Sequence, residues 1–257
     1  MPNKRLGQHW LKDRLILEAI ADSTLLESND TVLEIGPGLG TLTSSILRRV
    51  GSVVAVEYDA QLARKLPGQF PGKNLQVLNA DILLFDLSVL PTGYKVVANV
   101  PYYITQKIIE HFLTSVNKPV SMALLVQKEV AEKLAAQPGE LTAIAVKLQY
   151  QYNVQLGTRV PREYFIPPPK VDSQVILCIK RDVGKYAQSD FQRFSRVVDA
   201  GYSSPRKKIR STLSGGLSIT KDEVERICLE AGIDPESRPS AVSVEQWMKV
   251  MEAYDKS

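Results

Sequence analysis

The chain has 257 residues, of which 44% are hydrophobic and 23% are charged, a balance typical of a soluble globular protein and not of a disordered one. Its length predicts one large domain, or a large domain with a small appendage. Two cysteines cannot build a disulfide framework, and no apolar run reaches the roughly 18 to 20 residues that a membrane span needs. The net charge of +4 is too small to indicate a polyanionic partner by itself, so the distribution of charge along the chain matters more.

Helical patterns alternate with short apolar, β-branched runs in the first half of the chain. An amphipathic helix with Asp13 as its N-cap is expected over residues 13–27. Five apolar runs follow, at residues 31–35, 52–56, 75–78, 94–98 and 120–126. Continuous hydrophobicity is typical of strands buried on both faces of a parallel sheet. The alternation with helices therefore predicts a doubly wound, Rossmann-like α/β fold.

The pattern changes in the second half of the chain. Residues 141–151 and 171–180 are expected to be further strands that close the sheet. Beyond residue 183 only helical patterns occur, expected over residues 191–202, 206–213, 221–231 and 244–254, with Gly215-Gly216 as a break. The sequence thus predicts an α/β domain over residues 1–183 and a small all-α domain over residues 184–257.

Motifs at the ends of three successive strands indicate a nucleoside-cofactor site. The first strand leads into Glu34-Ile-Gly36-Pro-Gly38-Leu-Gly40, where glycines let a ligand approach the backbone near a helix N-terminus. Glu57 ends the second strand about 20 residues later, where a carboxylate can bind both hydroxyls of a ribose. Asp81-Ile82 follows the third strand, where an acid can accept a hydrogen bond from the exocyclic amine of adenine.

The charge beside the glycines indicates which nucleoside binds. The G-x-G-x-x-G spacing of dinucleotide sites is absent, and so is the Gly-Lys-Ser/Thr of a P-loop. Glu34 would repel a pyrophosphate, whereas it would attract the ammonium and sulfonium groups of S-adenosylmethionine (SAM). We therefore expect SAM as the cofactor; the alternative is that the glycines only form a tight turn.

The segment Asn99-Val100-Pro101-Tyr102, at the end of the fourth strand, indicates the chemistry. An exocyclic adenine nitrogen is a poor nucleophile because its lone pair is delocalised into the ring. Acceptors at both of its N–H bonds, the Asn99 amide oxygen and the carbonyl of Val100 or Pro101, would stabilise the positive charge that develops during methyl transfer. Tyr102 offers an aromatic face for a base taken out of its stack. Taken alone, the segment is more typical of a strand end punctuated by proline, with a buried tyrosine; its place beside a SAM site favours the catalytic interpretation.

Over almost its full length the chain resembles the ribosomal RNA adenine dimethyltransferases of the KsgA type. The residues that carry the resemblance lie at 4–11, 34–43, 55–59, 99–102, 127–131, 165–173 and 238–243. Val100 stands where the family usually has leucine, which leaves the backbone carbonyl in place. The expected cofactor contacts are His9, Leu11, Gly36, Gly38, Glu57, Asp81, Ile82 and Asn99. The expected catalytic residues are Asn99, Pro101, Tyr102 and Phe165, with Phe165 as a second stacking face.

Basic residues gather between residues 193 and 210, where six of them accompany one acid. This local excess is larger than the +4 of the whole chain, so it predicts a surface that binds phosphate. The expected RNA contacts are Lys4, Arg5, Arg206, Lys207, Lys208 and Arg210. Two histidines and two distant cysteines do not match an ordinary metal site, so no metal is expected.

The resemblance implies SAM-dependent N6,N6-dimethylation of two adjacent adenosines in the 3′-terminal hairpin of small-subunit rRNA, during ribosome biogenesis. The partner would be the rRNA or an immature small subunit, and we expect a cytoplasmic monomer, since the N-terminus has no signal-peptide pattern. Three alternatives remain open. They are an antibiotic-resistance methyltransferase that acts on large-subunit rRNA, a non-catalytic nucleic-acid-binding assembly factor and, least favoured, an NAD-dependent oxidoreductase. The intact segment 99–102 argues against a pure binder, and the basic patch with residues 238–243 favours the small-subunit enzyme.

Overall fold

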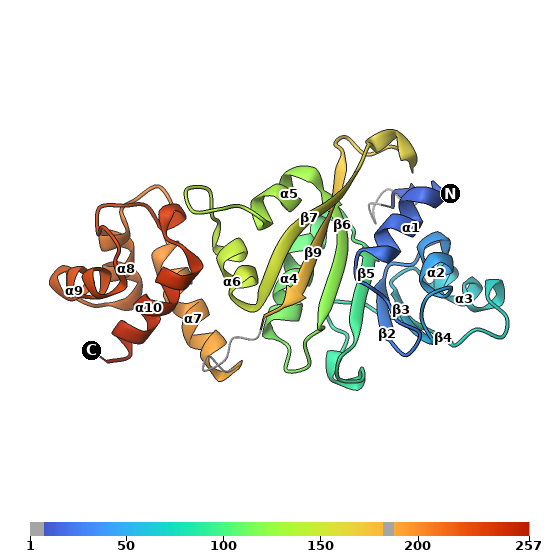
Figure 1. Ribbon diagram of the computed structural model, residues 1–257, viewed down its shortest axis with the longest axis horizontal. Coiled ribbons are helices and arrows are strands. Elements are labelled where there is room, and N and C mark those ends of the chain that lie inside the picture. The colour runs from blue at the N-terminus through green and yellow to red at the C-terminus, as the bar shows by residue number, and fades with distance from the viewer. Residues whose placement is uncertain (1–7, 182–187, 257) are drawn as a thin grey trace. The chain divides into compact units, whose positions relative to one another are not determined.

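The computed structural model describes residues 8–181 and 188–256 (Figure 1). Its contacts divide the chain into two compact units. The first comprises the described part of Met1–Glu132 together with Asn153–Lys180, and the second comprises Lys133–Tyr152 together with the described part of Arg181–Ser257. Residues 133–152 thus belong to the helical unit, whereas the sequence analysis placed them before a single boundary at residue 183.

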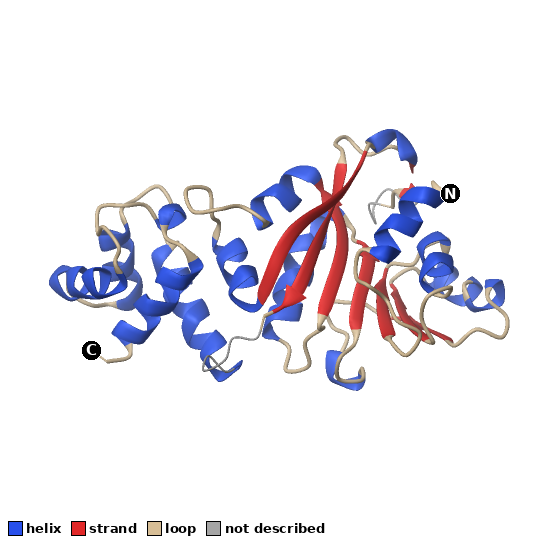
Figure 2. Ribbon diagram, viewed as in Figure 1, coloured by secondary structure: helices blue, strands red, loops and turns tan. Residues whose placement is uncertain are grey.

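A seven-stranded sheet forms the centre of the first unit, with the strand order β4-β3-β2-β5-β6-β9-β7 (Figure 2). Its strands are β2 (Thr31–Ile35), β3 (Ser52–Glu57), β4 (Leu75–Asn79), β5 (Lys95–Asn99), β6 (Ser121–Gln127), β7 (Tyr152–Val160) and β9 (Ser173–Lys180). Strands β2 to β6 pair in parallel, and β9 is antiparallel to β6. The reversal of strand order between β2 and β5 is that of a doubly wound fold, so the predicted fold class is confirmed.

Helices precede, connect and follow the parallel strands of this unit. They are α1 (Arg14–Asp22), α2 (Thr41–Ile46), α3 (Ala60–Lys65), α4 (Thr105–Thr114) and α5 (Lys128–Leu134). As predicted, Asp13 caps α1, because its carboxylate accepts a hydrogen bond from the backbone N–H of Ile16 at 3.0 Å. The helix ends at Asp22, five residues before the expected end at residue 27.

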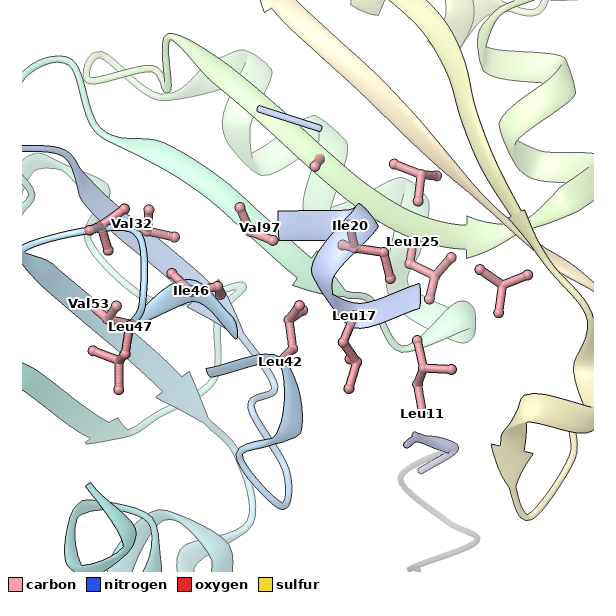
Figure 3. Close-up of a cluster of buried hydrophobic side chains, with 14 of the residues drawn as sticks. Leu11, Leu17, Ile20, Val32, Leu42, Ile46, Leu47, Val53, Val97 and Leu125 are labelled. Atoms are coloured by element: carbon pink, nitrogen blue, oxygen red, sulfur yellow. The ribbon is translucent and has the colours of Figure 1, made fainter. Parts of the chain in front are cut away.

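Buried aliphatic side chains pack α1 and α2 against the sheet (Figure 3). The labelled members of this cluster are Leu11, Leu17, Ile20, Val32, Leu42, Ile46, Leu47, Val53, Val97 and Leu125. Each buried side chain of this size contributes about 1.5–3 kcal/mol relative to an exposed one. The core thereby fixes α1 and the start of α2 beside the carboxyl ends of the central strands.

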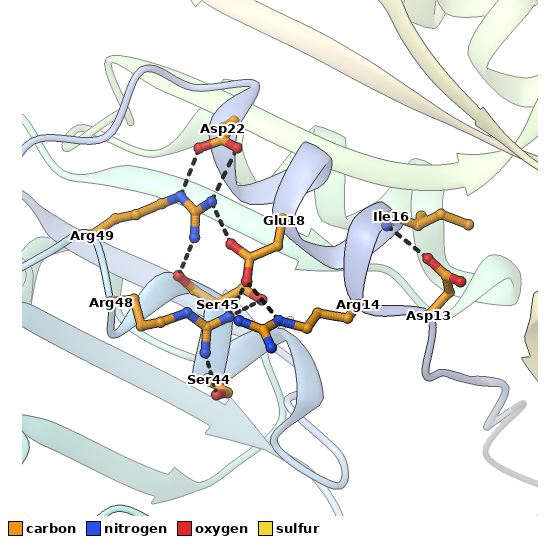
Figure 4. A network of polar contacts seen from close by, with 9 residues as sticks. All are labelled: Asp13, Arg14, Ile16, Glu18, Asp22, Ser44, Ser45, Arg48 and Arg49. Atoms are coloured by element: carbon orange, nitrogen blue, oxygen red, sulfur yellow. Dashed lines mark hydrogen bonds and ion pairs between the residues drawn. The ribbon is translucent and has the colours of Figure 1, made fainter.

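A polar network links the same two helices at the surface (Figure 4). The Arg49 guanidinium donates two hydrogen bonds to the carboxylate of Asp22, at 2.7 and 3.0 Å, and pairs with Glu18 at 2.5 Å. Arg48 also pairs with Glu18 and donates to Ser44. The hydrogen bonds from Arg49 lower the pKa of both Glu18 and Asp22. Asp22 and Arg48 are exposed, while Glu18 and Arg49 are half-buried, so the network mainly orients α1 against the end of α2.

The strand expected over residues 141–151 is wrong, because this segment is helix α6 (Ala143–Gln151). The Thr142 hydroxyl caps α6 by accepting from the backbone of the third helical residue. Apolar residues occur nearly all around the helix, and the ring of Tyr150 stacks on that of Phe194, with centroids 4.0 Å apart. A short segment that is buried on several sides has the same apolar pattern whether it is a helix or a strand, so only its tertiary partner distinguishes the two.

Four further helices complete the second unit, namely α7 (Gln188–Gly201), α8 (Ile209–Leu217), α9 (Lys221–Ala231) and α10 (Val244–Tyr254). The bounds of α9 and α10 match the prediction, and each helix begins with a capping box. The break expected at Gly215-Gly216 is wrong, because both glycines lie inside α8. A side-chain carbon at Gly216 would lie 2.6 Å from the Cα atom of Ala200. This glycine therefore allows α7 and α8 to approach each other instead of ending a helix.

No helix within residues 8–181 and 188–256 is long and apolar enough to cross a membrane.

Candidate active site

A cavity of about 350 Å³ opens where β2, β3 and β5 end. Carboxyl ends of parallel strands are where α/β folds bind ligands. Apart from Phe165, every residue expected in the cofactor or catalytic set lines this cavity: His9, Leu11, Gly36, Gly38, Glu57, Asp81, Ile82, Asn99, Pro101 and Tyr102. Residues far apart in the chain therefore converge on one site.

The glycine loop after β2 leaves room for a ligand. Gly36, Gly38 and Gly40 all have left-handed backbone, with φ of 62°, 58° and 79°. A Cβ atom at Gly36 would meet nothing within 4 Å, whereas one at Gly40 would lie 2.7 Å from the side chain of Leu66. Gly36 thus keeps the cavity open, while Gly40 permits close packing beneath it.

Glu57 is fixed at the end of β3 by backbone hydrogen bonds. One carboxylate oxygen accepts from the N–H of Gly38 at 3.0 Å, and the other accepts from the N–H of Asp59 at 2.8 Å. Burial raises the pKa of Glu57, and both of these hydrogen bonds oppose the rise. The carboxylate is therefore held rigidly against the glycine loop, as a bidentate ribose ligand requires.

Asp81, Tyr58 and Tyr103 also line the cavity. The Asp81 carboxylate accepts from the backbone of Leu83 at 2.9 Å, which orients it. Tyr103 is 62% exposed, and burial of part of its ring together with the charge of Asp81 raises its pKa. The sequence analysis missed Tyr58 and Tyr103 as lining residues, although each directly follows a residue that it did select.

Glu34 is the most unusual ionisable group of the site. Its side chain is 1% exposed, and neither carboxyl oxygen has a partner in hydrogen-bond geometry. Burial raises the pKa of Glu34 to about 8; the nearby Thr43 hydroxyl opposes this rise, and the charge of Glu57 adds to it. A buried carboxyl group with only the Thr43 hydroxyl close by, beside the open space at Gly36, fits a cationic ligand group, so these residues fit SAM.

The amide of Asn99 has a defined orientation. Its Nδ2 donates a hydrogen bond to the backbone carbonyl of His9, at 3.2 Å. Because a carbonyl only accepts, the amide nitrogen must face His9, and Oδ1 is the atom available to accept from another donor. The carbonyl of Pro101 accepts from Ile104 N–H at 3.2 Å and from the Thr105 hydroxyl at 3.4 Å. Val100 and Pro101 are the two residues whose carbonyls could accept from the adenine. The Pro101 carbonyl already accepts hydrogen bonds within the following turn.

Tyr102 is held at its hydroxyl and over its ring. The hydroxyl lies 2.6 Å from the Oγ atom of Ser173, which is fully buried, and the ring is stacked on the His9 imidazole. Burial raises the pKa of Tyr102, and its hydrogen bond with Ser173 opposes this rise, so the phenol is neutral at physiological pH. Sequence reasoning included Ser173 in a motif but gave it no role.

Phe165 lies in a short strand, β8 (Phe165–Ile166), which pairs antiparallel with β1 (Trp10–Leu11). It is 1% exposed and belongs to the hydrophobic core, opposite Leu11 in the pairing. Phe165 thus supports the segment that carries His9 and Leu11 to the cavity.

The basic residues expected to bind RNA differ in their surroundings. Lys208 pairs with Glu236, and Arg210 pairs with Glu225 at 2.7 Å. Arg206 and Lys207 are exposed, and the remaining two expected contacts, Lys4 and Arg5, lie outside the described residues. Within the described ranges, no group of three or more His, Cys, Asp or Glu residues is arranged to hold a metal ion.

Comparison with known proteins identifies the family. The model of the ribosomal RNA adenine dimethylase family matches residues 2–256. A curated protein from Dehalococcoides mccartyi, named ribosomal RNA small subunit methyltransferase A, is 36% identical over 255 residues that cover 98% of this chain and 88% of that protein. A protein of the same name from a Nostoc species is 37% identical over 264 residues, with 97% and 96% coverage.

Solved structures agree with this match. The 23S rRNA methyltransferase ErmE is 27% identical and superposes with a TM-score of 0.78, over 96% of this chain and 99% of its own. A dimethyladenosine transferase from Plasmodium falciparum shares the fold, with a TM-score of 0.81 at 23% identity and coverage of 96% and 98%. The resemblance predicted from the motifs is confirmed: this chain belongs to the ribosomal RNA adenine dimethylase family.

Proposed function

We propose that the protein dimethylates the exocyclic N6 of adenosine in small-subunit rRNA, with SAM as the methyl donor. The observation that carries this proposal is the orientation of Asn99. Its amide oxygen is available as an acceptor, beside Tyr102 and at the edge of a cavity whose residues fit SAM.

Four groups would hold the cofactor. Glu57 would accept from both ribose hydroxyls, Asp81 would accept from the adenine amine beside Ile82, and Glu34 would face the cationic end. Gly36 would let the backbone come close to the ligand. When bound, SAM supplies a methyl group that is activated by attachment to a positively charged sulfur.

The target adenine would stack on Tyr102 with its N6 pointing at the strand end. Its N–H bonds would donate to Asn99 Oδ1 and to the carbonyl of Val100, since the Pro101 carbonyl is used by the following turn. As N6 gained the methyl group and the methyl–sulfur bond broke to leave S-adenosylhomocysteine, these acceptors would stabilise the positive charge on the nitrogen. The product cation then loses its proton to water, so the site needs no general base.

The second methylation poses a geometric requirement. After the first transfer only one N–H bond remains on N6, so Asn99 and the Val100 carbonyl can no longer both accept from it. Rotation about the C6–N6 bond would present the lone pair of the monomethylated N6 to a second SAM molecule.

The substrate would be two adjacent adenosines in the 3′-terminal hairpin, in rRNA or an immature small subunit, during ribosome biogenesis in the cytoplasm. Two relatives named for the small subunit are 36% and 37% identical to this chain, against 27% for ErmE. Exposed Arg206 and Lys207 would contact phosphates, together with Lys4 and Arg5 from the N-terminus. We expect the protein to act as a monomer.

Large-subunit rRNA is the second candidate substrate, because the 23S rRNA methyltransferase ErmE superposes over 96% of this chain. The test is transfer of labelled methyl groups from SAM to unmethylated small subunits and, in parallel, to naked large-subunit rRNA. We expect nearly two methyl groups on each of two small-subunit adenosines and none with Asn99→Ala. Label on large-subunit rRNA alone would establish the second candidate, and binding without transfer would indicate an assembly factor.

A further inference from the structure

His9 contacts three parts of the catalytic region, and the mechanism above gives it no role. Its ring Nδ1 lies 2.7 Å from the carbonyl oxygen of Pro167, and its own carbonyl accepts from Asn99. Its imidazole is stacked on the ring of Tyr102, with centroids 5.8 Å apart and 17° between the planes. Asn99 and Tyr102 are the two side chains that handle the target base in the proposed function.

The contact with Pro167 determines the tautomer of His9. A carbonyl oxygen only accepts hydrogen bonds, so Nδ1 must carry a proton and donate it. The residues after His9 form β1, which pairs with β8, and β8 directly precedes Pro167. The backbone and the ring of His9 are thus attached to the same segment, and the plane of the imidazole is fixed relative to it.

Tyr102 is fixed at two places by contacts of different kinds. The hydroxyl is hydrogen-bonded with buried Ser173, and the imidazole of His9 is stacked on one side of the ring, with centroids 5.8 Å apart. Offset stacking at this separation is favourable. Since a base needs an uncovered face, the opposite face of Tyr102 is the one left for the adenine.

We propose that His9 is a positioning residue for the target adenine. Its imidazole supports one face of Tyr102 while the base stacks on the other, and its carbonyl turns the Asn99 amide so that Oδ1 accepts from N6. The inference rests on the proposed function and deepens it, because the family resemblance placed His9 only among the cofactor contacts.

Three variants separate the contributions of the His9 side chain, and all of them keep the backbone carbonyl. His9→Phe retains an aromatic ring without the Nδ1–H donor, His9→Asn retains a short donor without the ring, and His9→Ala retains neither. Each is assayed for single-turnover methyl transfer to unmethylated small subunits at saturating SAM. Calorimetry gives the Kd for SAM of the free protein, and thermal melting verifies the fold.

We expect His9→Ala to slow transfer by about 10-fold, which corresponds to about 1.4 kcal/mol and to the upper range of a ring pair. His9→Asn should behave like His9→Ala, whereas His9→Phe should stay within about 3-fold of the wild-type rate. The Kd for SAM should change by less than about 3-fold in all three variants.

Any of three results would overturn the inference. If His9→Phe melts normally but transfers as slowly as His9→Ala, the ring does not support Tyr102 from behind. If His9→Ala weakens SAM binding and leaves transfer at saturating SAM unchanged, His9 is a cofactor contact only. Asn99→Ala in the same assay tests the proposed function separately. Full activity of Asn99→Ala would refute the proposed function. If Asn99→Ala is inactive while all His9 variants are fully active, only the role proposed for His9 is refuted.

Discussion

Glu34 should release a proton when SAM binds. In the free protein, burial raises the pKa of this carboxyl group to about 8, so at pH 7 about nine in ten molecules carry the proton. An ammonium group placed beside Glu34 favours the carboxylate, so binding at pH 7 should release close to one proton. Titration calorimetry at pH 7, in two buffers with different ionisation enthalpies, measures this number directly.

The matched variant is Glu34→Gln, which keeps the shape of the side chain and cannot ionise. It should bind SAM more weakly and release almost no proton. S-adenosylhomocysteine, which has the ammonium but no sulfonium, should release the same proton from the wild-type protein. Equal binding heats in both buffers for the wild-type protein would refute the reasoning, because Glu34 would then be ionised before binding or would not face the ligand.

The same shift predicts how stability depends on pH. Because the folded-state pKa of Glu34 is raised from 4.5 to about 8, the folded protein keeps a proton that the unfolded chain releases within this interval. The free energy of unfolding should therefore fall as pH rises from 4.5 to about 8, by about 5 kcal/mol at most from Glu34. Urea unfolding across this range should show a smaller fall in Glu34→Gln, with the remaining slope attributable in part to Glu57, whose pKa is also raised. An equally steep fall in the variant would contradict this assignment.

Three further predictions concern other residues. Gly36→Ala and Gly40→Ala both force a side chain into left-handed backbone, but only the Cβ atom of Gly40→Ala also collides with Leu66. Gly40→Ala should therefore be less stable than Gly36→Ala by about 1–3 kcal/mol, the range for overpacking, and equal melting temperatures would contradict this. Gly36→Ala should mainly weaken SAM binding. Tyr202→Phe removes the donor to two backbone carbonyls at 3.0 and 3.1 Å and should lower the free energy of unfolding in urea by about 1 kcal/mol; an unchanged value would contradict this. Asn99→Asp replaces the amide nitrogen with a carboxylate oxygen, which would lie 3.2 Å from the carbonyl oxygen of His9 and could not donate to it. Single-turnover methyl transfer should therefore slow by at least about 10-fold. An unchanged rate would show that the amide nitrogen is not needed.

The residues that line the cavity could largely be predicted from the sequence because their signals are local. Buried parallel strands are continuous apolar runs, and ligands bind where such strands end, so Gly36, Glu57, Asp81 and Asn99 could be selected from their positions after each run, and Glu34 from its charge beside the glycines. The bounds of α9 and α10 were predictable for the same reason, since each helix begins with a capping box written in consecutive residues.

Contacts between residues distant in sequence decided the features that could not be predicted. Whether residues 143–151 form a helix or a strand depends on partners such as Phe194, and whether Gly216 ends a helix depends on the approach of Ala200. Likewise, no local pattern shows that Asn99 faces the His9 carbonyl, ninety residues earlier, or that Pro167 sets the tautomer of His9. Sequence thus determined which chemical groups stand at the strand ends, because hydrophobic periodicity and turn chemistry are local. Their orientation was decided only by the tertiary structure, because hydrogen bonds and stacking join groups that the chain brings together only when it folds.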